Sequence, residues 1–348
     1  MPAPRATSAH LVGSVNLPSA DAVFREVAQR LAERAPRIPD GETGERFYWL
    51  QFQSFRLDAT PGLQRVGDEP RLLRDRFDMR PFRLDGTVPA ADLAFPELGY
   101  AQAALDSFSR FAALQDEGVV PATTRFQVSL PTPAAVVSVF FTEEDRAAVE
   151  PAYTRALLAE LDRICAGVPH DRLSIQWDTA VEFSWLEAVP IRGRVAHPWW
   201  DDVQGGVLER AARLVAAVPD DVPVGFHLCY GDVEEAHFVQ PTDAGHLADV
   251  IRGVLERAPR SPAYFHLPVP IERDDEAYFA PLAGLSARVP LILGLVHHED
   301  GLEGARRRMA AAASAVPEFG VATECGFGRG PEERTVPLLD LHRAVLDA

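Results

Sequence analysis

Lysine is absent from the sequence, so all 34 basic residues are arginines, and they stand against 51 aspartates and glutamates. The formal net charge is −17, and no cluster of arginines is large enough to attract a polyanion. A nucleic-acid partner is therefore not expected, because such partners require a concentrated positive surface.

Cysteines and long apolar runs are also scarce. The 348 residues include three cysteines, too few for a disulfide framework. No run reaches the roughly 20 residues that cross a bilayer. Residues 1–14 lack the apolar core of a signal peptide. We therefore expect a cytoplasmic protein without membrane contact.

Short apolar runs alternate with amphipathic helical segments along the chain, whose length and 47% hydrophobic content fit one large barrel or two medium domains. The runs expected to be strands are 10–15, the start of 37–52, 125–130, 173–177, the stretch 222–232, 263–267, 291–296 and 320–325. The expected helices cover about 19–34, 100–115, 143–166, 202–218, 243–257, 274–287, 302–315 and 332–346. Eight such βα units predict an α/β fold, a single (β/α)8 TIM barrel over residues 1–348.

One segment after the second strand, at about 60–98, breaks this pattern. It is rich in proline, arginine and aspartate, and it is too long for an ordinary connection. We call it the excursion. We expect it to cover one mouth of the barrel, either as a lid or as the contact of a homodimer.

Polar and ionisable residues follow the apolar runs where each run stops. In TIM barrels the chemistry lies at the carboxyl ends of the strands, so this clustering supports the barrel and points to a site. Four of the ten histidines are among these residues. In chain order the residues are Ser14, Asn16, Asp40, Glu42, Thr132, Asp178, Glu182, His227, Cys229, His266, His297, His298, Glu324 and Cys325.

The stretch 222–232, VPVGFHLCYGD, carries the most specific chemistry. His227 and Cys229 are two residues apart, so on a strand both side chains point to the same face. A thiolate and a neutral imidazole suit zinc, and Cys325 offers a second thiolate. The alternative is that Cys229 and His227 are simply buried core residues. The concentration of ionisable residues at strand ends favours the metal site.

These segments resemble the catalytic barrel of cobalamin-independent methionine synthase, in the superfamily that includes uroporphyrinogen decarboxylase. HLCYGD resembles the family's HMCY segment, and ECGFG resembles its DCGL segment; the two supply a zinc histidine and two zinc cysteines. Weaker similarities link DGETGER to the family's HGExER turn, IQWDTAVE to IDEPALRE, SLPTP to LTGPVT and LGLVHHED to VYDIHS.

The resemblance implies a role for individual residues. It implies zinc ligands at His227, Cys229 and Cys325. It also implies a substrate site, whose residues would be Glu42 and Asp178 for an amino group, Arg46 for a carboxylate, and Glu182 beside them. The expected catalytic residues are His297 and Asp178. His297 would protonate the departing methyl donor, with His298 as the alternative.

The sequence differs from the family at the fourth zinc ligand. In the family this ligand is a glutamate at the end of the strand that follows the one with the zinc histidine and cysteine. Here that strand ends in His266, and Glu272 follows in a loop after two prolines. We expect His266 to be the ligand because it lies within the strand end. The connection after HLCYGD is also longer, and its segment 233–241 could form a substrate-specific wall.

The function implied is zinc-dependent transfer of a methyl group to a thiol, with homocysteine as acceptor and a methylfolate-type donor. Zn²⁺ would deprotonate the acceptor thiol, whose free pKa of about 8.5 leaves it mostly protonated at neutral pH. Two alternatives remain open. One is a zinc-dependent alkyltransferase or carbon–sulfur lyase that acts on another thiol, and the other is a metal-free, decarboxylase-like member of the superfamily.

Overall fold

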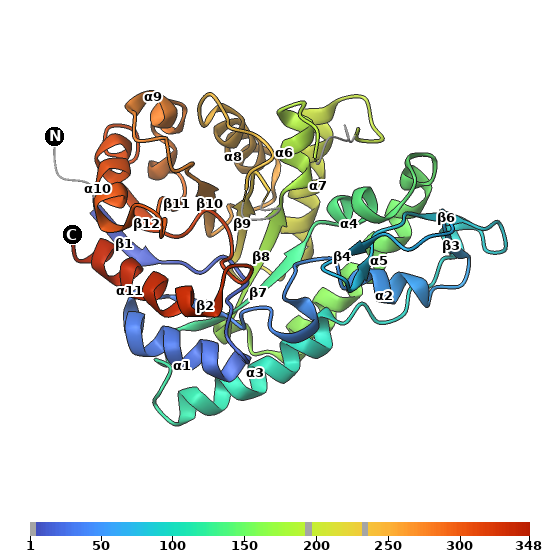
Figure 1. The fold of residues 1–348 in the computed structure, drawn as a ribbon, viewed down its shortest axis with the longest axis horizontal. Coiled ribbons are helices and arrows are strands. Elements are labelled where there is room, and N and C mark those ends of the chain that lie inside the picture. The colour runs from blue at the N-terminus through green and yellow to red at the C-terminus, as the bar shows by residue number, and fades with distance from the viewer. Residues whose placement is uncertain (1–4, 192–196, 232–235) are drawn as a thin grey trace.

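The computed structural model describes residues 5–191, 197–231 and 236–348. Its centre is a parallel sheet in the order β1-β12-β11-β10-β9-β8-β7-β2 (Figure 1). The strands are β1 (Arg5–Ala9), β2 (Arg37–Pro39), β7 (Arg125–Pro131), β8 (Leu173–Thr179), β9 (Val224–Leu228), β10 (Tyr264–Pro268), β11 (Leu291–Gly294) and β12 (Glu318–Val321). Beyond the edge strands, a parallel bridge joins Ser14 to Gly41. The predicted (β/α)8 barrel is confirmed.

Helices surround the sheet (Figure 1). The longer ones are α1 (Ala20–Leu31), α3 (Tyr100–Asp116), α5 (Glu143–Gly167), α7 (Val203–Ala217), α8 (Gly245–Arg257), α10 (Gly301–Ala312) and α11 (Thr335–Leu346). Side chains cap several of them: Ser19 accepts from the backbone N–H of Ala22, and Asp202 accepts from that of Gly205. The short helices α2 (Gln53–Asp58), α4 (Pro133–Phe140), α6 (Val181–Leu186) and α9 (Glu276–Phe279) complete the set among the described residues.

Two of the expected elements are wrong. The first strand is β1 rather than 10–15, because pairing with β12 becomes irregular after Ala6 and ends at Ala9. Segment 10–15 is apolar because it is buried at the mouth of the barrel, and burial alone does not make a strand. The helix expected at 274–287 is interrupted, since Gly284 has a φ of 80° and α9 is followed by two short 3₁₀ turns.

The excursion is folded rather than structureless. It contains two antiparallel pairs, β3 (Leu63–Arg65) with β6 (Phe82–Leu84) and β4 (Leu72–Leu73) with β5 (Phe77–Asp78). Figure 1 shows these strands beside α4, at one side of the barrel. A bridge between Phe82 and Phe141 joins the excursion to the turn between α4 and α5. This contact fixes the excursion against the barrel.

In the described part of the chain, no helix has both the length and the apolar character needed to cross a membrane.

Candidate metal centre and substrate pocket

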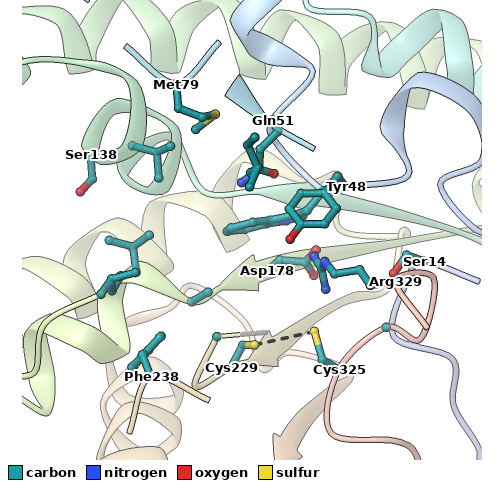
Figure 2. Close-up of a pocket in the computed structure, with 18 of the residues that line it drawn as sticks. Ser14, Tyr48, Gln51, Met79, Ser138, Asp178, Cys229, Phe238, Cys325 and Arg329 are labelled. Carbon is teal, nitrogen blue, oxygen red and sulfur yellow. Dashed lines mark hydrogen bonds between the residues drawn. The ribbon is translucent and has the colours of Figure 1, made fainter. Parts of the chain in front are cut away.

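A pocket of about 480 Å³ opens at the carboxyl ends of the barrel strands. Its walls come from β8, from the loops after β1, β2, β9 and β12, from the excursion and from the turn between α4 and α5. Figure 2 shows Cys229 and Cys325 on one side of it and Met79 on the opposite side. The predicted site residues that line it are Glu42, Asp178, His227, Cys229 and Cys325.

His227, Cys229 and Cys325 form what we call the His–Cys–Cys group. His227 is in β9, Cys229 follows that strand, and Cys325 follows β12. The sulfur of Cys325 is 3.9 Å from that of Cys229 and 3.6 Å from Nε2 of His227. The three ligand atoms all lie within 4.8 Å of one another. Side-chain alternation along β9 and the position of β12 in the barrel therefore bring these residues to one point.

His266, the expected fourth ligand, lies beside this group and is not part of it. In the parallel pairing of β9 with β10, His266 is the direct neighbour of His227, so the two imidazoles lie side by side. Nδ1 of His266 is 2.7 Å from Nδ1 of His227, and its Nε2 is 3.0 Å from the carbonyl oxygen of Thr323. Both ring nitrogens of His266 are thus engaged away from the thiols. Glu272, the alternative, is exposed after β10.

The chemistry of the three donors fits zinc. Two thiols and one imidazole are a donor set that zinc prefers, and each thiol loses its proton when the metal binds. Catalytic zinc sites combine three protein ligands with one position for water or substrate. Cys325 is partly exposed and lines the pocket, so a ligand in the pocket can reach the group.

Glu42 and Asp178 are a pair of buried carboxyl groups in the pocket wall, which we call the carboxyl pair. Burial raises the pKa of Glu42 to about 7; Arg46 opposes this rise and Asp40 adds to it. Burial, and then the nearby charge of Glu42, raise the pKa of Asp178 well above its usual range. With a pKa of about 7, Glu42 is partly protonated near neutral pH, and a bound cation would favour its charged form.

The turn after β2 holds Glu42 in a conformation that few side chains adopt. Its φ is 51°, in the left-handed region, and its backbone N–H donates to Oδ1 of Asp40 at 3.0 Å. The other oxygen of Asp40 accepts from Arg46 and from the hydroxyl of Ser107. A Cβ on Gly13 would lie 3.0 Å from Oε1 of Glu42, so the glycine leaves room for the carboxyl group.

Arg46 and Glu182, two of the predicted substrate contacts, are not among the residues that line this pocket. Arg46 pairs with Asp40 at 2.5 Å, and its side chain does not line the pocket. Glu182 is buried in α6 and accepts a hydrogen bond from Thr132, the residue that caps α4. Both side chains therefore support the structure behind the pocket, because ionisable residues at strand ends can turn inward as well as toward a substrate.

His297 is buried and His298 is exposed, so the two adjacent histidines lie in different surroundings. Nε2 of His297 donates to the carbonyl of Val269, and its Nδ1 is 3.6 Å from Glu324. His237 approaches the other oxygen of Glu324 at 3.3 Å. His297 does not line the pocket, so the structure gives no direct contact for the acid function predicted from the sequence.

Arg329 is a pocket residue that the sequence reasoning missed. It follows β12 in the glycine-rich segment GFGRG, and its positive charge opposes the rise that burial causes in the pKa of Glu42 and of Asp178. Its guanidinium lies 5.0 Å from the centre of the Tyr48 ring, and Figure 2 shows both beside Asp178. The available signal was an arginine just beyond the cysteine at the end of the last strand.

One part of the remaining pocket wall is apolar. The excursion contributes Leu73, Met79 and Pro81, and Phe141 lies at the end of α4. The excursion thus contributes part of the pocket wall at this mouth of the barrel. For the wall expected at 233–241, residues 233–235 and the preceding Asp232 lie outside the described residues. Phe238, in the same segment, does line the pocket.

The fold is similar to that of solved methionine synthase-like proteins. A B12-independent methionine synthase from Shewanella sp. W3-18-1, in complex with selenomethionine, has a TM-score of 0.60 and 13% identity, covering 99% of this chain and 96% of its own. A putative vitamin-B12 independent methionine synthase from Listeria monocytogenes has a TM-score of 0.59 and 14% identity, covering 99% and 98%. A methyltransferase from Methanosarcina mazei has a TM-score of 0.56 and 12% identity, covering 100% and 95%. No family model matches the sequence, and no curated protein does.

Proposed function

We propose that this chain is a zinc-dependent methyltransferase that methylates the sulfur of a small thiol, with homocysteine as the acceptor and a methylfolate-type compound as the donor. The observation that carries the proposal is the His–Cys–Cys group, whose ligand atoms lie within 4.8 Å of one another at the carboxyl end of the barrel. The fold shared with methionine synthase-like proteins supports it, one of which was solved with selenomethionine, the selenium analogue of methionine.

His227, Cys229 and Cys325 would hold the zinc. When bound, the metal supplies a position at which the acceptor thiol ionises near neutral pH. The acceptor sulfur then forms the new bond to the methyl carbon as the bond from that carbon to the donor breaks. The acceptor thiol loses one proton, and the departing atom of the donor takes up one proton, so the reaction is balanced.

The carboxyl pair would bind the ammonium group of an amino-acid acceptor. Glu42 and Asp178 line the same pocket as the His–Cys–Cys group, so one small molecule can reach both ends. We assign the acceptor's carboxylate to Arg329 rather than Arg46, because Arg329 lines the pocket and Arg46 pairs with Asp40. The apolar wall that includes Met79 would hold the body of the donor.

The first experiment is the metal content of protein purified without chelator or metal-affinity tag, compared with Cys229→Ser and Cys325→Ser. We expect about one zinc per chain in the wild type and loss of zinc in both variants. Cys165→Ser is the matched control, because Cys165 is a free thiol buried in α5 and should not affect zinc.

Methyl transfer to homocysteine is then assayed with each class of methyl donor. Methionine formation supports the full proposal. Zinc binding without methionine favours the alkyltransferase or carbon–sulfur lyase acting on another thiol. A wild type that takes up no zinc, even after zinc is added, would favour the metal-free alternative.

A further inference from the structure

We infer that His266 is a positioning residue that holds His227 in the tautomer whose unprotonated Nε2 faces the two thiols, and that His266 is not itself a metal ligand. The inference rests on the metal centre of the proposed function. It concerns the strand end at which the family that the sequence resembles supplies its fourth ligand, so it assigns a different function to that position.

The hydrogen bonds determine where the protons are. A carbonyl oxygen can only accept, so the contact of 3.0 Å between Nε2 of His266 and the Thr323 carbonyl places a proton on that nitrogen. The 2.7 Å between the two Nδ1 atoms of His266 and His227 is a hydrogen bond that requires one proton between them. A neutral His266 has no second proton, so its Nδ1 accepts and Nδ1 of His227 donates.

The surroundings keep His266 neutral. Its side chain is 0% exposed, and within the described part of the chain its hydrogen-bond partners are an imidazole and a carbonyl, neither of which is an anion. A buried imidazolium without a counter-ion is strongly disfavoured. The ring of His10, which lies beside Arg37, is 5.7 Å away and adds no negative charge.

The tautomer of His227 determines which of its ring nitrogens is available to the His–Cys–Cys group. With its proton on Nδ1, His227 keeps a lone pair on Nε2, the nitrogen that lies 3.6 Å from the sulfur of Cys325. Ligating histidines are commonly oriented in this way by an acceptor at the opposite nitrogen. Here the acceptor is a second imidazole, placed by the strand register that pairs His266 with His227. His227, Cys229 and Cys325 would then be the three protein donors to the zinc, and the acceptor thiol would supply the fourth donor.

Nitrogen-15 NMR of metal-free wild-type protein, labelled at histidine, tests the tautomers without zinc or activity. We expect His227 to carry its proton on Nδ1 and His266 to carry its proton on Nε2. A proton on Nε2 of His227 would overturn the inference. This result is independent of the proposed function, which fails instead if the wild type does not bind zinc or methylate a thiol.

Variants test the consequence for the metal. Loss of an orienting partner typically lowers metal affinity roughly 10- to 100-fold, and we expect this for His266→Leu. His266→Gln should recover most of it, because its amide can accept from His227 and donate to Thr323. His342→Gln is the matched control, since His342 is equally buried and its Nδ1 bonds the Leu338 carbonyl in α11. It should leave zinc affinity unchanged.

X-ray absorption of the zinc-loaded proteins counts the ligands. We expect one histidine nitrogen and the same sulfur shell in the wild type and in His266→Gln. Two histidine nitrogens in the wild type and one in the variant would make His266 a ligand and overturn the inference. Because these measurements use the wild type and the conservative variant, they decide the question even if His266→Leu does not fold.

Discussion

The two ends of the pocket are held by different kinds of interaction. Behind the His–Cys–Cys group lies the neutral imidazole of His266, which is hydrogen-bonded to His227 and to the backbone carbonyl of Thr323. Behind the carboxyl pair lie charges, with Asp40 and Arg46 acting on Glu42, and Glu42 in turn acting on Asp178. At the His–Cys–Cys group, which we call the sulfur end, hydrogen-bond geometry therefore determines which ring nitrogen carries the proton. At the carboxyl pair, which we call the carboxyl end, nearby charges and pH determine whether the side chains are ionised. This difference predicts that the two ends respond differently to the same change of acceptor.

The largest effect is expected from Cys325→Ser, measured with homocysteine and with 4-mercaptobutyrate, which lacks only the amino group. A ligand should matter more than an orienting partner, so kcat/KM should fall by more than about 100-fold with both acceptors. Both acceptors carry the thiol, and under the proposed function the sulfur end would act on the thiol alone. A loss confined to homocysteine would contradict the assignment of Cys325 to this end.

Asp178→Asn should produce a loss that depends on the acceptor. Its Oδ1 accepts from Gln176 at 2.9 Å, a hydrogen bond that an asparagine oxygen can keep, so the fold should be retained. A charged hydrogen bond contributes about 1.5–3 kcal/mol, which predicts a roughly 10- to 100-fold lower kcat/KM with homocysteine. The reaction with 4-mercaptobutyrate should change little. Equal losses with both acceptors would show that Asp178 does not recognise the ammonium group.

The pH dependence of acceptor binding should come from the carboxyl end. The pKa of Glu42 is raised to about 7, so below this pH the group is protonated and cannot pair with an ammonium. The KM ratio of homocysteine to 4-mercaptobutyrate should therefore fall about tenfold between pH 6 and pH 8. The ratio cancels the thiol ionisation that both acceptors share. Glu42→Gln should weaken this dependence on pH, because Asp178 is then the remaining buried carboxyl group of the pair. An unchanged slope in that variant would assign the titration to another group.

The sulfur end could be predicted from the sequence because its signal is local. The spacing of His227 and Cys229 places both side chains on one face, and the alternation of strands and helices places Cys325 at the same barrel end. The position of His266 could not be predicted in this way. It depends on the register between β9 and β10, a long-range property that leaves no pattern within either strand.

The carboxyl end was predictable only in part. A strand-end carboxylate is visible in the sequence, but whether it faces the pocket depends on local backbone geometry and on its neighbours. Glu42 lines the pocket after a left-handed turn, whereas Arg46, four residues later, is turned toward Asp40. Arg329 was missed because loops carry no periodicity from which the direction of a side chain can be inferred.

The smallest effect is expected at the apolar wall, which should distinguish the donor from both acceptors. Met79 lines the pocket from the excursion, so Met79→Ala should raise the KM of the donor and leave the KM of homocysteine unchanged. Burying a methionine side chain contributes about 1.5–3 kcal/mol, so partial loss of the contact predicts a rise of roughly three- to tenfold. Leu72→Ser is the matched control, because Leu72 is in the same excursion, is 53% exposed and does not line the pocket. If Met79→Ala instead raised the KM of homocysteine, the excursion would belong to the acceptor site. The assignment of the apolar wall to the donor, and of the sulfur and carboxyl ends to the acceptor, would then be wrong.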